Sequence, residues 1–209
     1  GKRQLLNEIT PLIPKRITTY VEPFLGGGAV LFNLQPKKAI INDFNKDLIN
    51  VYRVVRDNPQ ELLDILKKHD KYNCEDYYYE IRALDRSENY TNMSNLEKAA
   101  RIIYLNKTCY NGLFRVNQAG QFNSPYGKYK NPNIVNEPVI LAMSNYFKNN
   151  NIKIMEGDYR DALKNLRKGA FVYFDPPYMP ISSSSSFTGY TENGFNEKDQ
   201  IELKIECDK

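Results

Sequence analysis

Short apolar runs alternate along this chain with segments whose apolar residues recur every three to four positions. The runs predict β-strands at residues 20–21, 39–43, 152–155 and 170–174. The periodic segments between them predict helices at residues 29–32, 47–55 and 158–166. The last run is aromatic and β-branched, which predicts a strand buried on both faces. This order of elements predicts an α/β fold built on a parallel, Rossmann-like sheet.

A mostly helical insertion interrupts the alternation. It has helical periodicity at residues 59–68, 75–85, 96–104 and 138–148. Residues 111–133 are instead rich in Asn, Gly, Gln, Pro and Tyr, which predicts a hairpin or an ordered loop. We therefore expect a sheet domain of residues 1–55 and 146–209, and an inserted domain of residues 56–145. Shorter helices are expected at residues 3–13 and 196–209.

Composition narrows the classes of function. A formal net charge of +4 is weak support for a polyanionic partner. The three cysteines lie far apart and His69 is the only histidine, which argues against a zinc site, a disulfide framework and a Cys–His nucleophile. We expect no metal. No apolar run approaches the roughly 20 residues that span a bilayer, so we expect a cytoplasmic protein without a membrane partner.

The tetrapeptide Asp175-Pro176-Pro177-Tyr178 directly follows the last predicted strand. Because neither proline has an N–H, strand pairing must stop there, at the strand end where open α/β sheets bind ligands. The Asp175 carboxylate and the Pro176 carbonyl can both accept hydrogen bonds from an exocyclic amino group, and Tyr178 can stack on the ring that carries it. The alternative is a proline-rich strand exit with a structural Asp and a core Tyr.

A glycine-rich turn, residues 22–28, follows the first predicted strand. Its glycines permit positive φ and close approach of a ligand. Asp43 follows about 20 residues on, where an acidic residue can bind a ribose. The turn lacks the full Gly-x-Gly-x-x-Gly spacing of dinucleotide-binding folds, because Leu31 stands at the position of the third glycine. This favours an adenosine ligand other than a nicotinamide cofactor. Asp158, beside Tyr159, could bind an adenine amino group. Both acids could instead be helix N-caps.

Residues 98–136 contain no Asp or Glu. Cations and aromatic residues are interleaved there: Lys98, Arg101, Lys107, Arg115, Lys128 and Lys130, with Tyr104, Tyr110, Phe114, Phe122, Tyr126 and Tyr129. Cations neutralise phosphates and aromatic rings stack on unpaired bases. Presented from a hairpin, Arg115 could contact guanine through two hydrogen bonds. The alternative is an ordinary solvated surface with structural tyrosines.

In this order, the motifs resemble the DNA adenine-N6 methyltransferases of the Dam type, in particular the GATC-modifying methylases of restriction–modification systems. The matching segments are Pro23-Phe24-Leu25-Gly26-Gly27-Gly28, Asn42-Asp43-Phe44-Asn45, residues 110–117 and 121–129, Asp175-Pro176-Pro177-Tyr178 and residues 187–191. Together they run through nearly the whole chain. The resemblance implies a Rossmann-like methyltransferase sheet with a DNA-recognition insertion.

The resemblance also implies a cofactor and residue roles. S-adenosyl-L-methionine would be the methyl donor, held by Lys2, Phe24, Gly26, Gly28, Asp43, Asp158, Tyr159 and Asp175, with Asp43 on the ribose. DNA would be held by Lys107, Tyr110, Asn111, Leu113, Arg115, Asn117, Asn123, Pro125 and Lys128. Among these, Arg115 would read a guanine, Leu113 and Pro125 a thymine methyl, and Tyr110 and Asn111 would fill the gap left by a flipped base.

The implied mechanism begins with an adenine leaving the duplex, because its N6 cannot be reached inside the stack. Asp175 and the Pro176 carbonyl would bind the N6 hydrogens and direct the nitrogen lone pair, while Tyr178 stacks on the base. Direct displacement then needs orientation and electrostatics but no enzyme nucleophile. These three residues are the expected catalytic set.

Two other functions stay open on sequence grounds. A catalytically silent DNA-binding remnant would keep the insertion and lose the cofactor. A methyltransferase acting on RNA or on a protein glutamine would usually carry Asn at the first position of the tetrapeptide and lack the Asn-Gly-Leu-x-Arg hairpin.

The chain departs from the family pattern at both ends. It has no Trp, whereas the family carries one just before the Gly-Lys that opens this chain, and it stops before the family's further strands. We therefore expect a fragment that binds the cofactor weakly and turns over slowly, with the strand before Asp175 exposed as a sheet edge. The expected partners are DNA, a second copy of the chain through that edge, and an endonuclease of the same system.

Overall fold

The structure, a computed structural model, describes residues 2–177 and 195–208. They divide into two compact units. Residues 2–49, 146–177 and 195–208 form the sheet unit, and residues 50–145 form the helical unit. Within the described residues, no helix is long and apolar enough to cross a bilayer.

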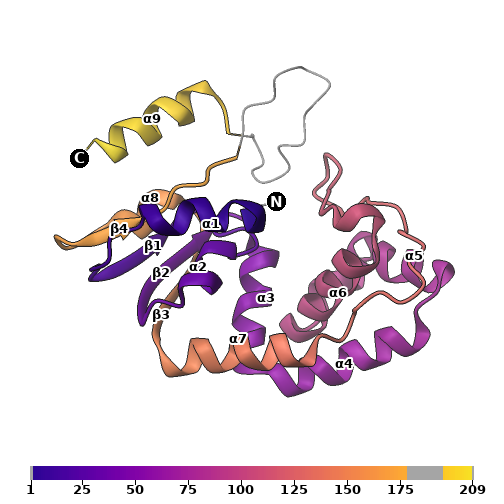
Figure 1. The fold of residues 1–209 in the computed structure, drawn as a ribbon. Coiled ribbons are helices and arrows are strands. Elements are labelled where there is room, and N and C mark those ends of the chain that lie inside the picture. Colours follow the sequence, from indigo (N-terminus) through magenta and orange to yellow (C-terminus); the bar gives the residue numbers. More distant parts are fainter. Residues whose placement is uncertain (1, 178–194, 209) are drawn as a thin grey trace. The chain divides into compact units, whose positions relative to one another are not determined.

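The described strands of the sheet unit form one parallel sheet in the order β3-β2-β1-β4 (Figure 1). The strands are β1 Thr19–Glu22, β2 Lys38–Asp43, β3 Asn151–Glu156 and β4 Ala170–Val172. The predicted α/β, Rossmann-like fold is thereby confirmed. Because the strand order reverses direction between β1 and β4, the switch point of the sheet lies between their carboxyl ends, where open α/β sheets bind ligands.

β1 is the buried strand at the centre, and all four of its residues are buried. The prediction that residues 170–174 form a strand buried on both faces was wrong. Regular pairing covers only Ala170–Val172, and these residues are half-buried. The reason is position: among the described residues β4 pairs with β1 alone, so its other edge is not covered by a strand. Tyr173 N–H still donates to Val21 O, at 2.8 Å.

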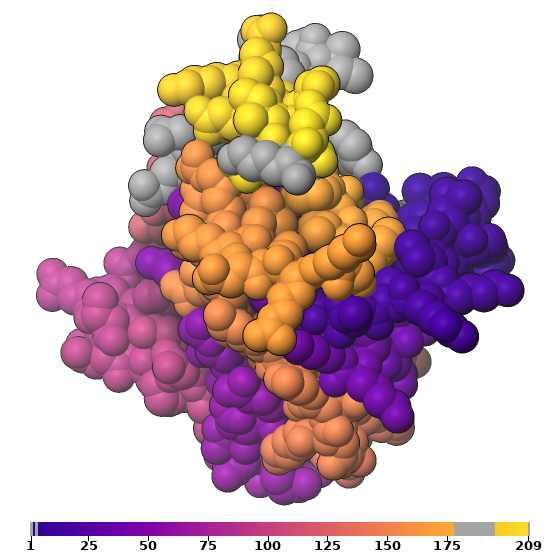
Figure 2. Space-filling model, turned by 90° about the vertical axis from the view of Figure 1, so that its left-hand side faces the viewer, coloured from indigo at the N-terminus to yellow at the C-terminus, as the bar shows by residue number. Residues whose placement is uncertain are grey.

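Short helices surround the sheet. They are η1 Lys2–Leu5, α1 Leu6–Ile9, η2 Thr10–Leu12, α2 Ala29–Leu34, α8 Tyr159–Leu163 and α9 Glu197–Cys207. The single helix predicted at residues 3–13 is three short pieces, and Pro11, which lacks the N–H that would continue an α-helix, follows directly after the end of α1 and Thr10. Leu203 of α9 packs on Tyr159 and Phe195, and Figure 2 shows α9 in yellow over the orange segment that contains α8 and β4.

The helical unit packs its helices around one core. Its elements are α4 Pro59–Tyr72, α5 Glu75–Ala83, η3 Leu84–Arg86, η4 Glu88–Asn92, α6 Asn95–Thr108 and η5 Tyr110–Gly112, and the boundaries between the units fall inside α3 Lys46–Asp57 and α7 Glu137–Asn149. Leu62, Leu66 and Tyr104 are fully buried in this core. The helix α6 begins at a capping box formed by Ser94 and Glu97.

The predicted hairpin follows α6. Val116 and Phe122 form an antiparallel bridge, and Asn117 N–H donates to Gln121 O at 2.8 Å. The turn passes through Gly120, whose φ of +73° favours glycine. We call residues 113–124 the recognition hairpin.

Candidate functional site

The glycine-rich turn joins the carboxyl end of β1 to α2. Gly26 and Gly28 have φ values of +49° and +63°, which favour glycine. A Cβ placed on Gly26, Gly27 or Gly157 would meet no heavy atom within 4 Å. The backbone at the ends of β1 and β3 is therefore open to close approach by a ligand.

Asp43, at the end of β2, is tied to this turn. Its carboxylate accepts hydrogen bonds from Gly26 N–H at 2.8 Å and from Asn45 N–H at 2.9 Å. Burial raises the pKa of Asp43, and these hydrogen bonds oppose the shift. The cap of α3 is Asn45, whose side chain accepts from the backbone N–H groups of Asp47 and Leu48. The interpretation of Asp43 as a helix cap was therefore wrong.

Glu22, the last residue of β1, is a buried acid that the sequence reasoning did not single out. It is 2% exposed, and its carboxylate accepts a hydrogen bond from Tyr20 Oη at 2.7 Å. Burial raises the pKa of Glu22 to about 7, and the neighbouring charges of Asp175 and Asp43 act in the same direction. We call Glu22, Asp43 and Asp175 the carboxylate cluster. The position of Glu22, at the end of a predicted strand and at the start of the glycine-rich turn, is the sequence feature that could have identified it.

Asp175 lies beyond β4 and pairs with Lys2 of η1. Their Oδ1 and Nζ atoms are 2.7 Å apart, and both side chains are partly exposed. Two residues on, Pro177 O accepts a hydrogen bond from Gln200 of α9, at 3.4 Å. Tyr178 and the matched segment 187–191 lie outside the described residues.

Two predicted cofactor residues, Phe24 and Tyr159, stack with their ring centroids 5.1 Å apart. Phe195 meets Phe24 edge-on, with centroids 5.7 Å apart. Tyr159 is buried, and its hydroxyl has no hydrogen-bond partner among the described residues. Phe44, directly after Asp43, is half exposed and was not predicted as a site residue.

Asp158 is the N-cap of α8, as the alternative interpretation proposed. Its carboxylate accepts from Arg160 N–H at 2.8 Å, and its Oδ2 lies 2.6 Å from Arg160 Nη2. These contacts hold the pKa of Asp158 below its ordinary value. The cap does not use every lone pair of the carboxylate, since an ionised carboxylate has about four acceptor positions.

The recognition hairpin brings Arg115 and Asn123 together. Arg115 Nε donates to Asn123 Oδ1 at 2.8 Å, and its Nη2 donates to Asn123 O at 3.3 Å. Asn117, predicted to hold a phosphate, uses its Oδ1 to accept from Ala119 N–H and Gln121 N–H, which closes the turn. Leu113 is 46% exposed.

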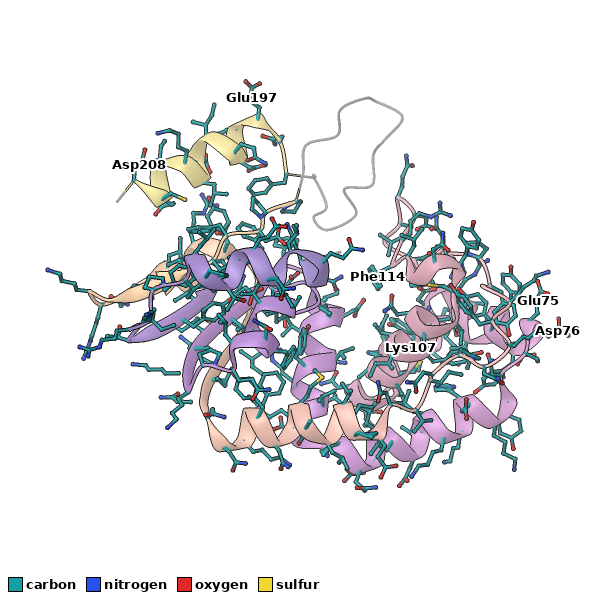
Figure 3. All side chains as sticks on the ribbon, viewed as in Figure 1. Glu75, Asp76, Lys107, Phe114, Glu197 and Asp208 are labelled. Carbon is teal, nitrogen blue, oxygen red and sulfur yellow. The ribbon has the colours of Figure 1, made fainter. Side chains whose placement is uncertain are left out.

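The other predicted DNA contacts surround the hairpin. Tyr110 is 55% exposed, and its N–H donates to Pro125 O at 2.8 Å. Asn111 has a φ of +54°. Lys107 is exposed near the end of α6, whereas Lys128 lies 3.3 Å from Glu75 in an exposed ion pair. In Figure 3, Lys107 and Phe114 lie on one side of the helical unit, with Glu75 and Asp76 on the opposite side.

A hollow of about 450 Å³ lies at the amino ends of β1 and β2, lined by Thr19, Lys38, Arg167 and neighbouring residues. It is at the end of the sheet opposite to the carboxylate cluster. Because ligands of open α/β sheets bind at the carboxyl ends of the strands, this hollow is not the candidate site.

The strand order, the glycine turn after β1 and the acids at the strand ends are the features of a Rossmann-like fold. The chain belongs to the D12 class N6 adenine-specific DNA methyltransferase family, which it matches over residues 1–209. The resemblance to adenine-N6 methyltransferases is thus confirmed, and the protein is an enzyme of this kind.

Curated relatives support this assignment. The chain is 50% identical over 204 residues to Type II methyltransferase M1.LlaDCHI of Lactococcus lactis subsp. cremoris, covering 98% of this chain and 72% of the relative. It is 42% identical to Type II methyltransferase M.MjaIII of Methanocaldococcus jannaschii, covering 97% and 75%. It is 33% identical to DNA adenine methylase of Escherichia coli (strain K12), covering 97% and 71%.

Proposed function

We propose that this enzyme transfers the methyl group of S-adenosylmethionine to N6 of adenine in duplex DNA, at GATC sites. Membership of the adenine-specific family supports the reaction. Two relatives are named Type II methyltransferases, so we include a partner restriction endonuclease in the proposal. The comparisons give no support to a catalytically silent remnant.

The carboxylate cluster fits the chemistry of this cofactor. S-adenosylmethionine carries a sulfonium and an ammonium group, and opposite charges within about 4–6 Å stabilise each other. Asp43 and Asp175 supply that negative charge beside a turn whose glycines leave open space, and Glu22 adds to it once it is deprotonated, above about pH 7. When bound, the cofactor would supply an electrophilic methyl group.

We assign each cofactor contact to a group with the matching chemistry. Asp43 would accept hydrogen bonds from ribose hydroxyls, and Lys2 would bind the carboxylate of the cofactor. The remaining acceptor position of Asp158 would take one hydrogen of the adenine amino group. The exposed ring of Phe44 offers an apolar face to a purine. The other proposed contacts are Phe24, Gly26, Gly28, Tyr159 and Asp175.

Asp175 and Pro176 would orient the target base. One carboxylate oxygen of Asp175 pairs with Lys2, which leaves the other to accept a hydrogen bond from N6 of a flipped adenine. The carbonyl of Pro176 would accept the second N6 hydrogen. The N6 lone pair would form the new N–C bond as the S–C bond of the donor breaks, and N6 would release one proton to solvent. Tyr178 would stack on the base.

The helical unit would recognise DNA. We assign the guanine contact to Arg115, which presents a planar fork of donors, and the thymine methyl contacts to Leu113 and Pro125. Tyr110 and Asn111 would fill the place of the flipped base. The proposed phosphate contacts are Lys107, Asn117, Asn123 and Lys128, of which Lys128 would exchange its exposed ion pair with Glu75 for a phosphate.

The observation that carries the proposal is the grouping of Asp175 with Glu22 and Asp43 beside the open glycine turn. The test is transfer of labelled methyl from S-adenosylmethionine to a duplex with one GATC site and to a duplex with that site scrambled. We expect label on adenine of the GATC duplex only, and its loss in Asp175→Ala. Equal labelling of both duplexes would overturn the sequence preference, and labelling by Asp175→Ala would overturn the catalytic role.

A further inference from the structure

In the second strand of the recognition hairpin, the backbone groups of Phe122 pair with no other strand among the described residues. Asn117 N–H donates to Gln121 O, and Asn123 N–H donates to Arg115 O. Val116 and Phe122 are therefore a non-hydrogen-bonded pair, in which the N–H and C=O of Phe122 point away from the first strand. Within the described residues, no third strand pairs with them.

Two side chains of η3 take the place of that strand. Phe122 N–H donates to Asp85 Oδ2 at 2.8 Å, and Arg86 Nη2 donates to Phe122 O at 2.7 Å. Asp85 and Arg86 also bind each other, with Oδ1 and Nη1 2.5 Å apart. One carboxylate and one guanidinium thus satisfy both groups that an edge strand would leave exposed.

A buried arginine of α6, Arg101, holds Asp85 of this pair in place. Arg101 is 1% exposed, and its Nη2 lies 2.8 Å from Asp85 Oδ2. Its guanidinium also donates to the carbonyls of Ile81 and Arg82, at 2.8 and 2.7 Å. Because a buried charge is costly unless it is paired and hydrogen-bonded, Asp85 and Arg101 hold each other in one geometry.

A second set of hydrogen bonds holds the hairpin at Ser124, two residues after Phe122. Backbone groups repeat their direction every second residue of a strand, so the carbonyl of Ser124 also points outward. It accepts hydrogen bonds from Tyr78 Oη at 2.9 Å and from Arg82 Nη1 at 3.1 Å. Asn123, which holds the side chain of Arg115, lies between these two fixed residues.

We propose that Asp85, Arg86 and Arg101, the hairpin clamp, position Arg115 and thereby set how well the enzyme discriminates its target sequence. The inference rests on the proposed function, in which Arg115 reads a guanine. A two-hydrogen-bond contact to a base requires the guanidinium at one distance and one angle. A hairpin released from the clamp keeps Arg115 and its charge but places them less accurately, so selectivity falls before affinity does.

The first test compares Asp85→Asn with wild type. The amide keeps the volume of the side chain but removes the charge that compensates Arg101. The measurement is the ratio of methylation efficiencies, kcat/KM, on a GATC duplex and on a duplex whose guanine is replaced. We expect this ratio to fall about tenfold, within the range that a single base contact carries. The salt dependence of DNA binding should not change, because the proposed phosphate contacts of the hairpin, Asn117 and Asn123, carry no charge. The affinity for the cofactor should not change either, because no proposed cofactor contact lies in the hairpin.

A second clamp variant and a matched control keep the test decisive if Asp85→Asn unfolds. Arg86→Met removes the donor to Phe122 O from a side chain that is about one third exposed. Asp57→Asn is the matched control, because Asp57 forms a two-bond pair with Arg56 elsewhere in the unit. Hydrogen exchange of residues 121–124 should accelerate in Asp85→Asn and Arg86→Met and stay unchanged in Asp57→Asn.

The outcomes separate the clamp from the proposed function. If wild type does not methylate adenine in either duplex, the proposed function fails. If wild type methylates selectively but the clamp variants keep that selectivity, or lose activity equally on both duplexes, the clamp is structural only and the inference is wrong. Faster exchange together with lost selectivity supports it.

Discussion

The buried carboxyl of Glu22 makes the stability of this enzyme depend on pH. Burial raises the pKa of Glu22 from its ordinary value of 4.5 to about 7. Between these two values the folded protein holds a proton that the unfolded chain releases. The contribution of Glu22 to stability is therefore complete below about pH 4.5 and is lost as the pH rises through about 7.

The size of this contribution follows from the two pKa values. One pKa unit corresponds to about 1.4 kcal/mol, so the difference between 4.5 and about 7 corresponds to about 3 kcal/mol. Glu22→Gln has the same shape and does not ionise. Its amide oxygen can still accept hydrogen bonds from Tyr20 Oη and the N–H of Leu31, which bind the native carboxylate.

The assay is the free energy of unfolding by urea for wild type and Glu22→Gln at pH 5 to 9. The stability of the variant relative to wild type should increase by about 3 kcal/mol across this range. Taking the difference removes the contribution of His69, whose pKa burial lowers to about 4 and whose contribution is lost as the pH falls. Parallel curves for the two proteins would refute a carboxyl that titrates near neutrality.

Four other substitutions test particular contacts. Gly127→Ala should lower the free energy of unfolding by about 1–3 kcal/mol, because its Cβ would lie 2.9 Å from Thr108 O; an unchanged denaturation midpoint would contradict this. Asp43→Ala should weaken cofactor binding at least about tenfold in a calorimetric titration, since it removes the proposed ribose acceptor and a carboxylate that holds the turn; wild-type affinity would exclude that role. Lys107→Ala should reduce the slope of log affinity for DNA against log salt by about 0.9, whereas Arg101→Met, checked for folding by circular dichroism, should leave the slope unchanged. The same Arg101→Met substitution should lower the free energy of unfolding by about 3 kcal/mol, because Asp85 loses its buried partner. If Arg101→Met changed the slope of log affinity for DNA against log salt, this arginine would contact DNA.

The arrangement of elements could be predicted because it depends on local pattern. Each strand of the sheet was found as an apolar run, and α6 and α7 extend only a few residues beyond the helical periodicity. The burial of β4 could not be found in this way. A strand of the same composition is buried when strands flank it on both sides and half-buried when one side has no strand. The sequence of residues 170–174 does not show how many strands lie beside it.

The positions of the candidate site residues at the strand ends could also be predicted from the chain. Asp43 and Asp175 follow apolar runs, and the parallel sheet brings the ends of those runs to one edge. Glu22 obeys the same rule and was overlooked beside the more visible glycines. Asp158 shows the limit of such reasoning, because a residue that begins a helix has the same position whether it caps the helix or binds a ligand.

No local pattern in the sequence indicated the hairpin clamp, and the clamp changes the interpretation of the acid-free stretch of residues 98–136. Residues 98–136 lack acids, which suggested that their cations are available to phosphates. Arg101 is instead buried against Asp85, an acid that lies before this stretch, and Lys128 pairs with Glu75. A count of charges along the chain therefore overstates the cations that face a polyanion. In our proposal, the electrostatic part of DNA binding comes from exposed cations such as Lys107, and Arg101 positions the hairpin.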